Sequence, residues 1–458
     1  MSSFRDRHPA KADAPKKRRK PIDPATAPIV RSAGGVYPAL FQNTVRALNT
    51  MLPLDKPADV AISQFFRANP ALGQQDRNWL AEAVFGVLRH GIWLNWRVPN
   101  CTPRQLLVVY LRLVRGLPQR ELASVLTEEE TAWLAAILAE TPGEAPLYAQ
   151  AELPEWVVTQ LQASMQDADI VALGRSLKQS APLDLRVNTM KDNRDALLSQ
   201  LTEMGFTPTA TPFSPIGLRL VGRPAIQATR HFKEGVFEVQ DEGSQLLGML
   251  LAPRRSEKVV DFCAGAGGKT LLLGAMMSST GRLYAFDISE KRIQRLGPRL
   301  QRSGLTNVQP EIIAHENDKR ISRLYGKIDR VLVDAPCSGL GTLRRNPDLK
   351  WRQSPNSVSE LVEKQASILA SAAKLLRVGG RLVYGTCSIL PAENQAQVDH
   401  FLATHPDFIQ LDASEVLAQA KVDLPLSGAS MQLTPQQHAT DGFFAAVFEK
   451  QAPAAAPV

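Results

Sequence analysis

Two cysteines of this chain stand directly after apolar runs that predict buried β-strands. Cys337 follows the run 330–333, and Cys387 follows the run 381–384. Because the carboxyl ends of parallel strands share the sheet edge at which ligands bind, we expect both thiols to face one crevice. A single cysteine at such a place is usually small buried filler, whereas two in matched positions favour a chemical role.

Paired thiols beside a carboxyl group suit the methylation of cytosine at carbon 5. That carbon is a poor nucleophile until a thiolate adds to the neighbouring C6 and makes C5 enamine-like. A proton donor at N3 stabilises the adduct, and Asp334 is the candidate if it stays protonated. After methyl transfer a base must remove the C5 proton, and a second thiol can serve. We expect both cysteines to need lowered pKa values, which a nearby sulfonium ion promotes.

A glycine-rich turn follows the first predicted strand of the same region, 258–262. The segment 263–270 is Cys-Ala-Gly-Ala-Gly-Gly-Lys-Thr, and a strand, turn and helix in this order bring backbone amides close to a nucleotide. A phosphate-binding P-loop needs glycine at position 263, and a dinucleotide fingerprint needs glycine at position 270. The chain has Cys263 and Thr270 there, so we predict S-adenosylmethionine, which contains adenosine but no phosphate.

Acidic residues at strand ends complete the predicted cofactor site. Asp287 ends the second strand, where it suits ribose hydroxyls, and Asp318 follows the third, where it suits the adenine amino group. The alternative is a tight turn that binds no ligand. The predicted cofactor-binding residues are Cys263, Ala264, Gly265, Ala266, Gly267, Gly268, Lys269, Asp287, Arg292, Asp318 and Asp334.

No metal site is predicted. The chain has four cysteines, which are too few for a disulfide framework and do not have zinc-site spacing. A zinc deaminase also modifies cytosine, but its Pro-Cys-x-x-Cys motif fails here because Leu340 follows Cys337 where a second cysteine is needed. We expect Cys101 to be filler and Cys263 to be filler that lines the cofactor turn.

Strand and helix patterns alternate over residues 236–450. Alternation at this spacing predicts a parallel sheet with helices on both faces. The predicted strands are 258–262, 282–286, 312–314, 330–333, 381–384 and 443–448, and the principal predicted helices are 290–302 and 358–376.

Two further domains are predicted before this sheet. Residues 28–150 have helical periodicity only, which predicts an all-helical domain. In residues 151–235 a helical stretch precedes short extended runs, which predicts a small α+β module. The polar or Ala/Pro-rich ends, 1–27 and 451–458, are predicted to be disordered tails.

Capping patterns locate two helices of the predicted helical domain. Asp76 precedes a helical run and is predicted to cap it. Thr127 and Glu130 have the spacing of a capping box, in which each side chain accepts a hydrogen bond from the other residue's backbone.

The charge balance favours a polyanionic partner. The net charge is +8, and a basic block occupies residues 16–20; such excess favours nucleic acid. Arg344, Arg345, Lys350, Trp351 and Arg352 either contact RNA or form an ordinary solvated loop. No apolar run is long enough to cross a bilayer, and no secretory signal is evident. We therefore expect a cytoplasmic monomer.

With these residues in hand, the chain resembles the Sun/Fmu-type RNA cytosine-C5 methyltransferases over Gln240 to Ser388. The segment 240–244, Gln-Asp-Glu-Gly-Ser, is similar to the family's motif before the cofactor turn, and 334–338 and 386–388 are similar to its two cysteine motifs. Less closely, 76–90 is similar to the NusB-like domain of the bacterial 16S rRNA enzymes, and 185–188 to the family's RNA-binding extension.

The resemblance implies a Rossmann-like methyltransferase domain with a mostly parallel seven-stranded sheet. It also implies that Cys387 is the nucleophile and that Cys337 assists product release. DNA cytosine methyltransferases use one such cysteine, so the pair favours RNA, with 16S rRNA expected. One departure is Ala266, where the family commonly has proline. The alternatives are a methyltransferase for tRNA or DNA and an inactive RNA-binding paralogue.

Overall fold

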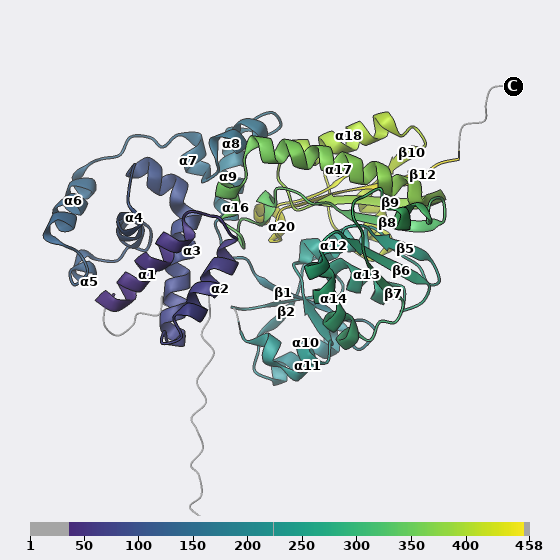
Figure 1. Cartoon of the computed structure of the whole chain (residues 1–458), viewed down its shortest axis with the longest axis horizontal. Helices are drawn as coiled ribbons and strands as arrows, with labels where there is room; N and C mark the ends of the chain where they lie inside the picture. The colour runs from purple at the N-terminus through teal and green to yellow at the C-terminus, as the bar shows by residue number, and fades with distance from the viewer. Residues whose placement is uncertain (1–35, 223, 453–458) are drawn as a thin grey trace, which may run out of the picture.

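The computed structural model describes residues 36–222 and 224–452. Helices fill the N-terminal part of the chain, a small sheet follows, and a larger sheet with helices on both faces forms the C-terminal part (Figure 1). Most of the two predicted tails, including the basic block at 16–20, lies outside the described residues.

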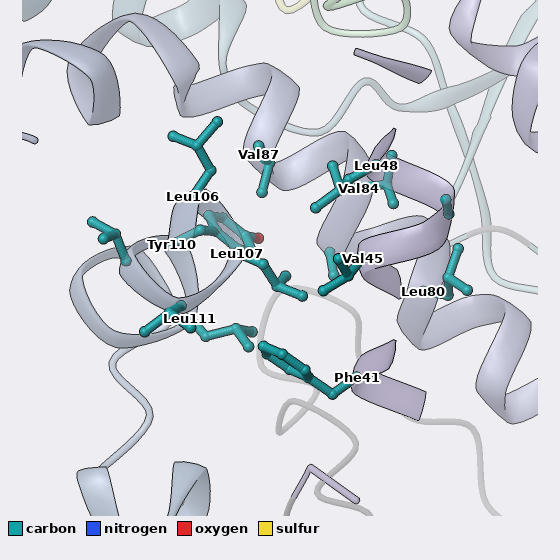
Figure 2. Packing of buried hydrophobic residues seen from close by; sticks show 14 of the residues in the cluster. Phe41, Val45, Leu48, Leu80, Val84, Val87, Leu106, Leu107, Tyr110 and Leu111 are labelled. Atoms are coloured by element: carbon teal, nitrogen blue, oxygen red, sulfur yellow. The ribbon is translucent and has the colours of Figure 1, made fainter. Parts of the chain in front are cut away.

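The N-terminal part is helical, as predicted, and has its own apolar core. Figure 2 shows this core, in which Phe41, Leu80 and Leu107 are buried. The helices are α1 (Pro38–Met51), α2 (Ala58–Ala68), α3 (Gln74–Arg97), α4 (Pro103–Val109), α5 (Gln119–Leu122), α6 (Glu128–Ala139), α7 (Leu147–Ala151), α8 (Glu155–Leu161) and α9 (Asp167–Leu177).

The structure confirms one capping prediction and corrects the other. Thr127 and Glu130 form the capping box of α6. Asp76 does not cap α3, because the N-cap residue is Gly73. The carboxylate lies in the first turn instead, where a negative charge favours the positive end of the helix dipole.

A four-stranded antiparallel sheet follows, in the order β2-β3-β1-β4. Its last strand, β4, lies just past residue 235, the predicted end of the small module. It nevertheless belongs to the small sheet, because residues 185–187 pair with it. The elements are β1 (Leu183–Val187), α10 (Arg194–Glu203), β2 (Pro208–Ala210), β3 (Gly217–Leu220), α11 (Arg230–Lys233) and β4 (Phe237–Val239).

The larger sheet is mostly parallel, in the order β10-β12-β9-β8-β5-β6-β7. Parallel ladders join β8 to β9, β5 to β8, β5 to β6 and β6 to β7, while β12 runs antiparallel to its neighbours. The strands are β5 (Lys258–Asp261), β6 (Arg282–Asp287), β7 (Val308–Ile312), β8 (Ile328–Asp334), β9 (Leu376–Thr386), β10 (Phe408–Leu411), β11 (Met431–Leu433) and β12 (Phe443–Lys450).

This sheet has the predicted Rossmann-like architecture with two local differences. It contains eight strands rather than seven, because the short β11 also pairs with β12. The strand predicted at 312–314 lies earlier, at Val308–Ile312. That strand is at the sheet edge, is largely exposed and contains Pro310, so it lacks an apolar run.

Helices cover both faces of the larger sheet (Figure 1). On one face α17 and α18 pack over buried side chains such as Tyr384 and Phe448, and on the other α12, α13 and α19 pack over Val383 and Val259. The helices are α12 (Glu242–Met249), α13 (Gly268–Met276), α14 (Glu290–Ser303), α15 (Lys319–Ser322), α16 (Leu349–Arg352), α17 (Pro355–Leu375), α18 (Gln395–Thr404), α19 (Ala413–Gln419) and α20 (Pro435–His438).

None of the helices in residues 36–222 and 224–452 is both long and apolar enough to span a membrane.

Candidate active site

The two predicted thiols lie at the same edge of the larger sheet. β8 and β9 are neighbours in register, with Asp334 opposite Gly385, so the loops that leave them run side by side. The Sγ atoms of Cys337 and Cys387 are 3.4 Å apart, and the backbone N–H of Cys387 points at the Cys337 sulfur at 3.3 Å. We call Cys337, Cys387, Asp334 and Lys269 the cysteine edge.

The Cys337 thiol is a weaker acid than an ordinary thiol. The hydrogen bond to the Cys387 sulfur and burial together raise the pKa of Cys337 well above its ordinary value. Cys337 therefore keeps its proton more firmly than an ordinary thiol. This differs from the expectation that both cysteines have lowered pKa values, because the second sulfur and the surrounding protein both oppose a charge on the first.

Asp334, which ends β8, has a cationic partner. The Nζ atom of Lys269, in the first turn of α13, lies 2.7 Å from Asp334 Oδ2. Burial acts to lower the pKa of Lys269, but the charge and the hydrogen bond of Asp334, with smaller contributions from neighbouring acidic groups, together outweigh it and hold the pKa above its ordinary value. Lys269 therefore stays protonated beside Asp334, the residue that the sequence predicts as the proton donor to N3.

The glycine-rich turn leaves β5 and enters α13. Gly265 and Gly267 both have positive φ, 57° and 86°, a conformation that glycine adopts without strain. A Cβ atom on Gly265 would meet nothing within 4 Å, whereas one on Gly267 would strike Leu296. The turn thus leaves space above Gly265 for a ligand and is closed by packing at Gly267.

Asp287, at the end of β6, lies beside this turn. One carboxylate oxygen accepts a hydrogen bond from Gly265 N at 2.9 Å, and the other accepts from Ser289 N at 2.7 Å. Each oxygen keeps acceptor capacity, which suits a pair of ribose hydroxyl groups. Arg292 approaches Asp287 at 3.8 Å but is mostly exposed, so it contacts only the outer side of the predicted site.

The other predicted cofactor residues occupy the same edge. Asp318 follows β7 and uses its carboxylate to cap α15, accepting from Ala314 N and Arg320 N. Cys263 lies in the turn, where burial and the nearby carboxylates raise its thiol pKa well above the ordinary value. Its raised pKa suits a lining residue rather than a nucleophile. No group of three or more His, Cys, Asp or Glu side chains that could hold a metal occurs among the described residues.

One residue that supports the turn was not identified as such from the sequence. Arg186, on β1 of the small sheet, is buried and donates to the carbonyl of Gly268 and to Gln240 Oε1, both at 2.7 Å. The segment 185–188 was expected to be part of an RNA-binding extension. In the structure its arginine fixes the start of α13 at the cofactor turn.

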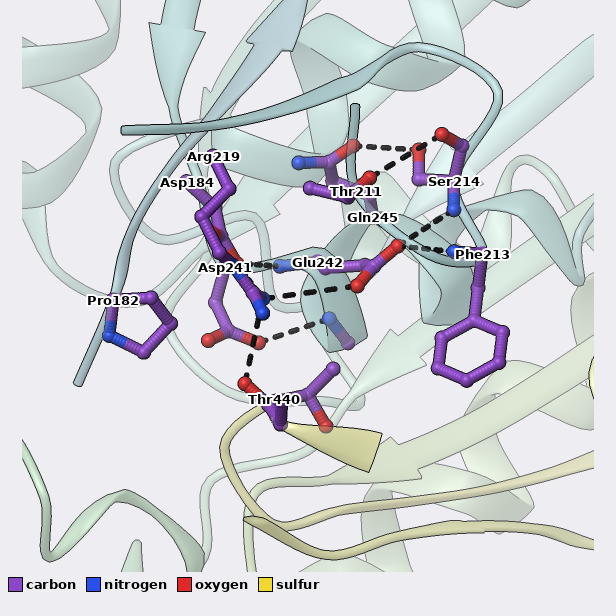
Figure 3. Close-up of polar contacts among 12 residues, drawn as sticks. Pro182, Asp184, Thr211, Phe213, Ser214, Arg219, Asp241, Glu242, Gln245 and Thr440 are labelled. Atoms are coloured by element: carbon purple, nitrogen blue, oxygen red, sulfur yellow. Dashed lines mark hydrogen bonds and ion pairs between the residues drawn. The ribbon is translucent and has the colours of Figure 1, made fainter. Parts of the chain in front are cut away.

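A polar network fixes the small sheet to the catalytic domain (Figure 3). Arg219 forms an ion pair with Asp184 at 2.7 Å, and Asp184 also accepts from Glu242 N at the start of α12. The Glu242 side chain, in turn, accepts from Phe213 N and Ser214 N, both at 2.7 Å. These contacts orient the small sheet, and hence Arg186, relative to the cofactor turn.

The basic residues after Cys337 hold the domains together. We call residues 344–352 the junction segment. Lys350 is buried and pairs with buried Glu152 at 2.9 Å, and its Nζ also donates to the carbonyl of Arg89 on α3. Trp351 Nε1 donates to the carbonyl of Leu88 at 3.4 Å.

The remaining contacts of the junction segment lie within the domain of the larger sheet or reach the helical domain. Arg344 and Arg345 both pair with Asp441, at 3.0 and 2.5 Å. Asp348 accepts from Ala58 N at the start of α2. The expectation of an RNA-contacting or merely solvated loop is therefore wrong for Lys350 and Arg344, which are only 3% and 4% exposed. Sequence spacing carried no signal for partners this distant in the chain.

Comparison with known families places the chain among RNA-modifying enzymes. A family model described as "16S rRNA methyltransferase RsmB/F" matches residues 248–449. A second, described as the ferredoxin-like domain of RsmF/B-like methyltransferases, matches residues 153–227.

Individual relatives match over most of their length. A probable ribosomal RNA small subunit methyltransferase B of Synechocystis sp. is 32% identical, over 86% of this chain and 96% of the relative. Ribosomal RNA small subunit methyltransferase B of Sodalis glossinidius is 31% identical, over 83% of this chain and 91% of the relative. The solved structure of PH0851 superposes with a TM-score of 0.73 at 26% identity, covering 91% of this chain and 99% of that protein.

Proposed function

Because this chain belongs to the RsmB/F family of rRNA methyltransferases, which use S-adenosylmethionine, we propose that it methylates C5 of a cytosine in 16S rRNA through a covalent Cys387 adduct. The observation that carries this proposal is the 3.4 Å separation of two sulfur atoms at one sheet edge. One thiol alone would suffice to form an adduct, whereas two suit a reaction that needs both a nucleophile and a base.

S-Adenosylmethionine, when bound, supplies an electrophilic methyl group. Gly265, with open space above it, and Asp287, with spare acceptor capacity, fit an adenosine moiety at this turn. Asp318 and Asp334 lie at the same edge and would complete the binding site. Arg186 has a supporting role, since it holds the turn from below.

The chain's own residues would then act in sequence. The Cys387 thiolate forms a bond to C6, and a proton from the Lys269–Asp334 pair reaches N3 as the ring electrons move there. C5 would take the methyl group as the carbon–sulfur bond that held it breaks, and the N3 proton would return to the Lys269–Asp334 pair. Cys337, as a thiolate, then removes the C5 proton, the C5–C6 double bond reforms, and the bond between C6 and Cys387 breaks. The raised pKa of Cys337 supports its role as the base, since a thiolate whose conjugate acid has a raised pKa is a stronger base than an ordinary thiolate.

The RNA must present an accessible base, because a cytosine within a helix shields C6. We propose that a monomer acts on an unpaired or flipped cytosine, with the helical domain and small sheet binding the surrounding rRNA.

The test uses the full chain, S-adenosylmethionine and 16S rRNA, both naked and in assembling subunits, followed by bisulfite sequencing. We expect protection from deamination at a single cytosine. Methylation of adenine, of another cytosine atom, or of protein but not RNA would contradict the proposal.

A further inference from the structure

A buried carboxylate, Glu393, joins the loops that carry the two cysteines. It lies in the short 3-10 turn Pro391–Glu393 after Cys387 and is 0% exposed. Ser338 directly follows Cys337, and Ser388 directly follows Cys387. Both serines are buried, and both hydroxyl groups donate to the same atom, Glu393 Oε2, the first of them at 2.5 Å.

The other carboxylate oxygen binds the Cys337 loop and a helix. Glu393 Oε1 accepts from the backbone N–H of Ser338 at 2.8 Å and from Gln365 Nε2 at 3.0 Å. Gln365, on α17, also donates to the carbonyl of Pro336 at 2.9 Å. The Tyr384 hydroxyl donates to the backbone carbonyl of Glu393 at 2.7 Å. Side chain and backbone of Glu393 are therefore both fixed.

These donors need acceptors, which the two oxygens of a carboxylate supply. Four hydrogen-bond donors converge on its two oxygens, and a proton on either oxygen would face one of them. A buried charge is tolerated when hydrogen bonds replace its hydration. A neutral amide of the same shape would offer an NH₂ group to donors that already point inward, which leaves buried groups unsatisfied.

We propose that Glu393 is a positioning residue that sets the separation of the Cys337 and Cys387 sulfur atoms by binding the serine after each. This inference rests on the proposed function and extends it to a residue that touches neither substrate nor cofactor. The matched Cys-Ser pairs are the sequence signal: each serine supplies one hydroxyl to a shared acceptor. Displacement of either loop would disturb nucleophile and base together.

The principal variant is Glu393→Gln, assayed on 16S rRNA. We expect kcat to fall about 100-fold, the scale of a 1 Å misplacement of a catalytic group. The dissociation constant for S-adenosylmethionine should stay within about threefold, because Glu393 does not contact the cofactor turn. Glu257→Gln is the matched control. Glu257 is also a mostly buried carboxylate, paired with Arg330 at 2.7 Å just before β5, at the opposite end of the sheet, and its loss should leave kcat near wild-type.

The pH profile of product release distinguishes a positioning role of Glu393 from a general loss of structure. The charge on Glu393 is one contributor to the raised pKa of Cys337, after the Cys387 hydrogen bond and burial. Glu393→Gln should therefore shift the pH profile of product release toward lower pH, while Glu257→Gln should not shift it.

Ser338→Ala and Ser388→Ala cover the case in which Glu393→Gln fails to fold. Each should lower kcat, and the double variant should lose less than the product of the single effects, because both hydroxyl groups act through one acceptor. A folded Glu393→Gln enzyme with wild-type kcat and pH profile would overturn the inference, as would serine variants that are each fully active. If the wild-type enzyme itself leaves cytosine unmodified, the proposed function fails instead.

Discussion

The cysteine edge and the junction segment both contain charged groups withdrawn from water, but they differ in how completely those groups are paired. At the junction, Lys350 and Glu152 are 3% and 0% exposed, and Lys350 also donates to backbone carbonyls. At the cysteine edge, Asp334 remains 32% exposed although it pairs with Lys269. The Lys350–Glu152 pair has no capacity left for a substrate, whereas the cysteine edge keeps some.

That difference separates residues that hold the molecule from residues that act on a substrate. Substitutions at the junction should alter stability and leave the chemistry intact in the folded fraction. Substitutions at the cysteine edge should alter chemistry and leave stability nearly unchanged. Four predictions, in decreasing order of expected effect, test this separation.

The largest effect is expected for Cys387→Ala. Without the nucleophile no adduct forms, and methyl transfer should fall by roughly 10⁴-fold or more, as for other covalent nucleophiles. The thermal midpoint should change little, because Cys387 is partly exposed. Tritium transfer from labelled S-adenosylmethionine measures the rate. Residual activity within tenfold of wild type would reverse the roles given to the two thiols or remove the covalent step.

Cys337→Ala should separate adduct formation from release. The nucleophile remains, but the base that removes the C5 proton is lost, and turnover should fall on the order of 10²- to 10⁴-fold. Unlike the Cys387 variant, this enzyme should accumulate a covalent complex with RNA, visible as a band that survives denaturing electrophoresis. The double variant is the control and should give no band. Normal turnover by Cys337→Ala would show that another base acts at C5.

Lys350→Met should affect stability first. It leaves the Glu152 carboxylate buried without its cation, which typically costs about 3–5 kcal/mol. Chemical denaturation measures the loss, and kcat per folded molecule should stay near wild-type. Arg352→Met, in the same segment but with a partly exposed, longer ion pair to Asp348 at 3.5 Å, should cost less than about 1 kcal/mol. Equal losses for the two variants would contradict the comparison.

The two regions also differ in how well they could be predicted. The residues of the cysteine edge follow strands with strong apolar runs, such as 330–333, and their chemistry depends on short local motifs. The junction pairs residues about 200 positions apart, 152 with 350, and nothing in local periodicity encodes such a pairing. The roles of Arg186 and Glu393 were missed for the same reason, because folding alone brings their hydrogen-bond partners close to them.

In the fold, likewise, strands with a strong local pattern were predicted and strands without one were not. Buried strands were predicted because both faces of a central parallel strand are apolar. β7, at the edge, and β11, with three residues, lack such a run. Asp76 was predicted as a cap from residue type alone, although the chain already enters the helix at Gln74. The domain boundaries at 27, 150, 235 and 450 stay predictions.

The smallest predicted effect is a pH dependence that belongs to the cysteine edge alone. Because the pKa of Cys337 is raised above its ordinary value, its thiolate is a minor form near neutral pH, and its fraction grows about tenfold per pH unit below that pKa. Product release should therefore accelerate about tenfold per unit between roughly pH 6 and 8, measured by chasing a preformed adduct. Cys337→Ala should abolish this slope, while Lys350→Met should keep it. A release rate independent of pH in the wild-type enzyme would mean that Cys337 enters the step already deprotonated. The different roles of the two cysteines would then have to be set by the bound RNA rather than by the protein.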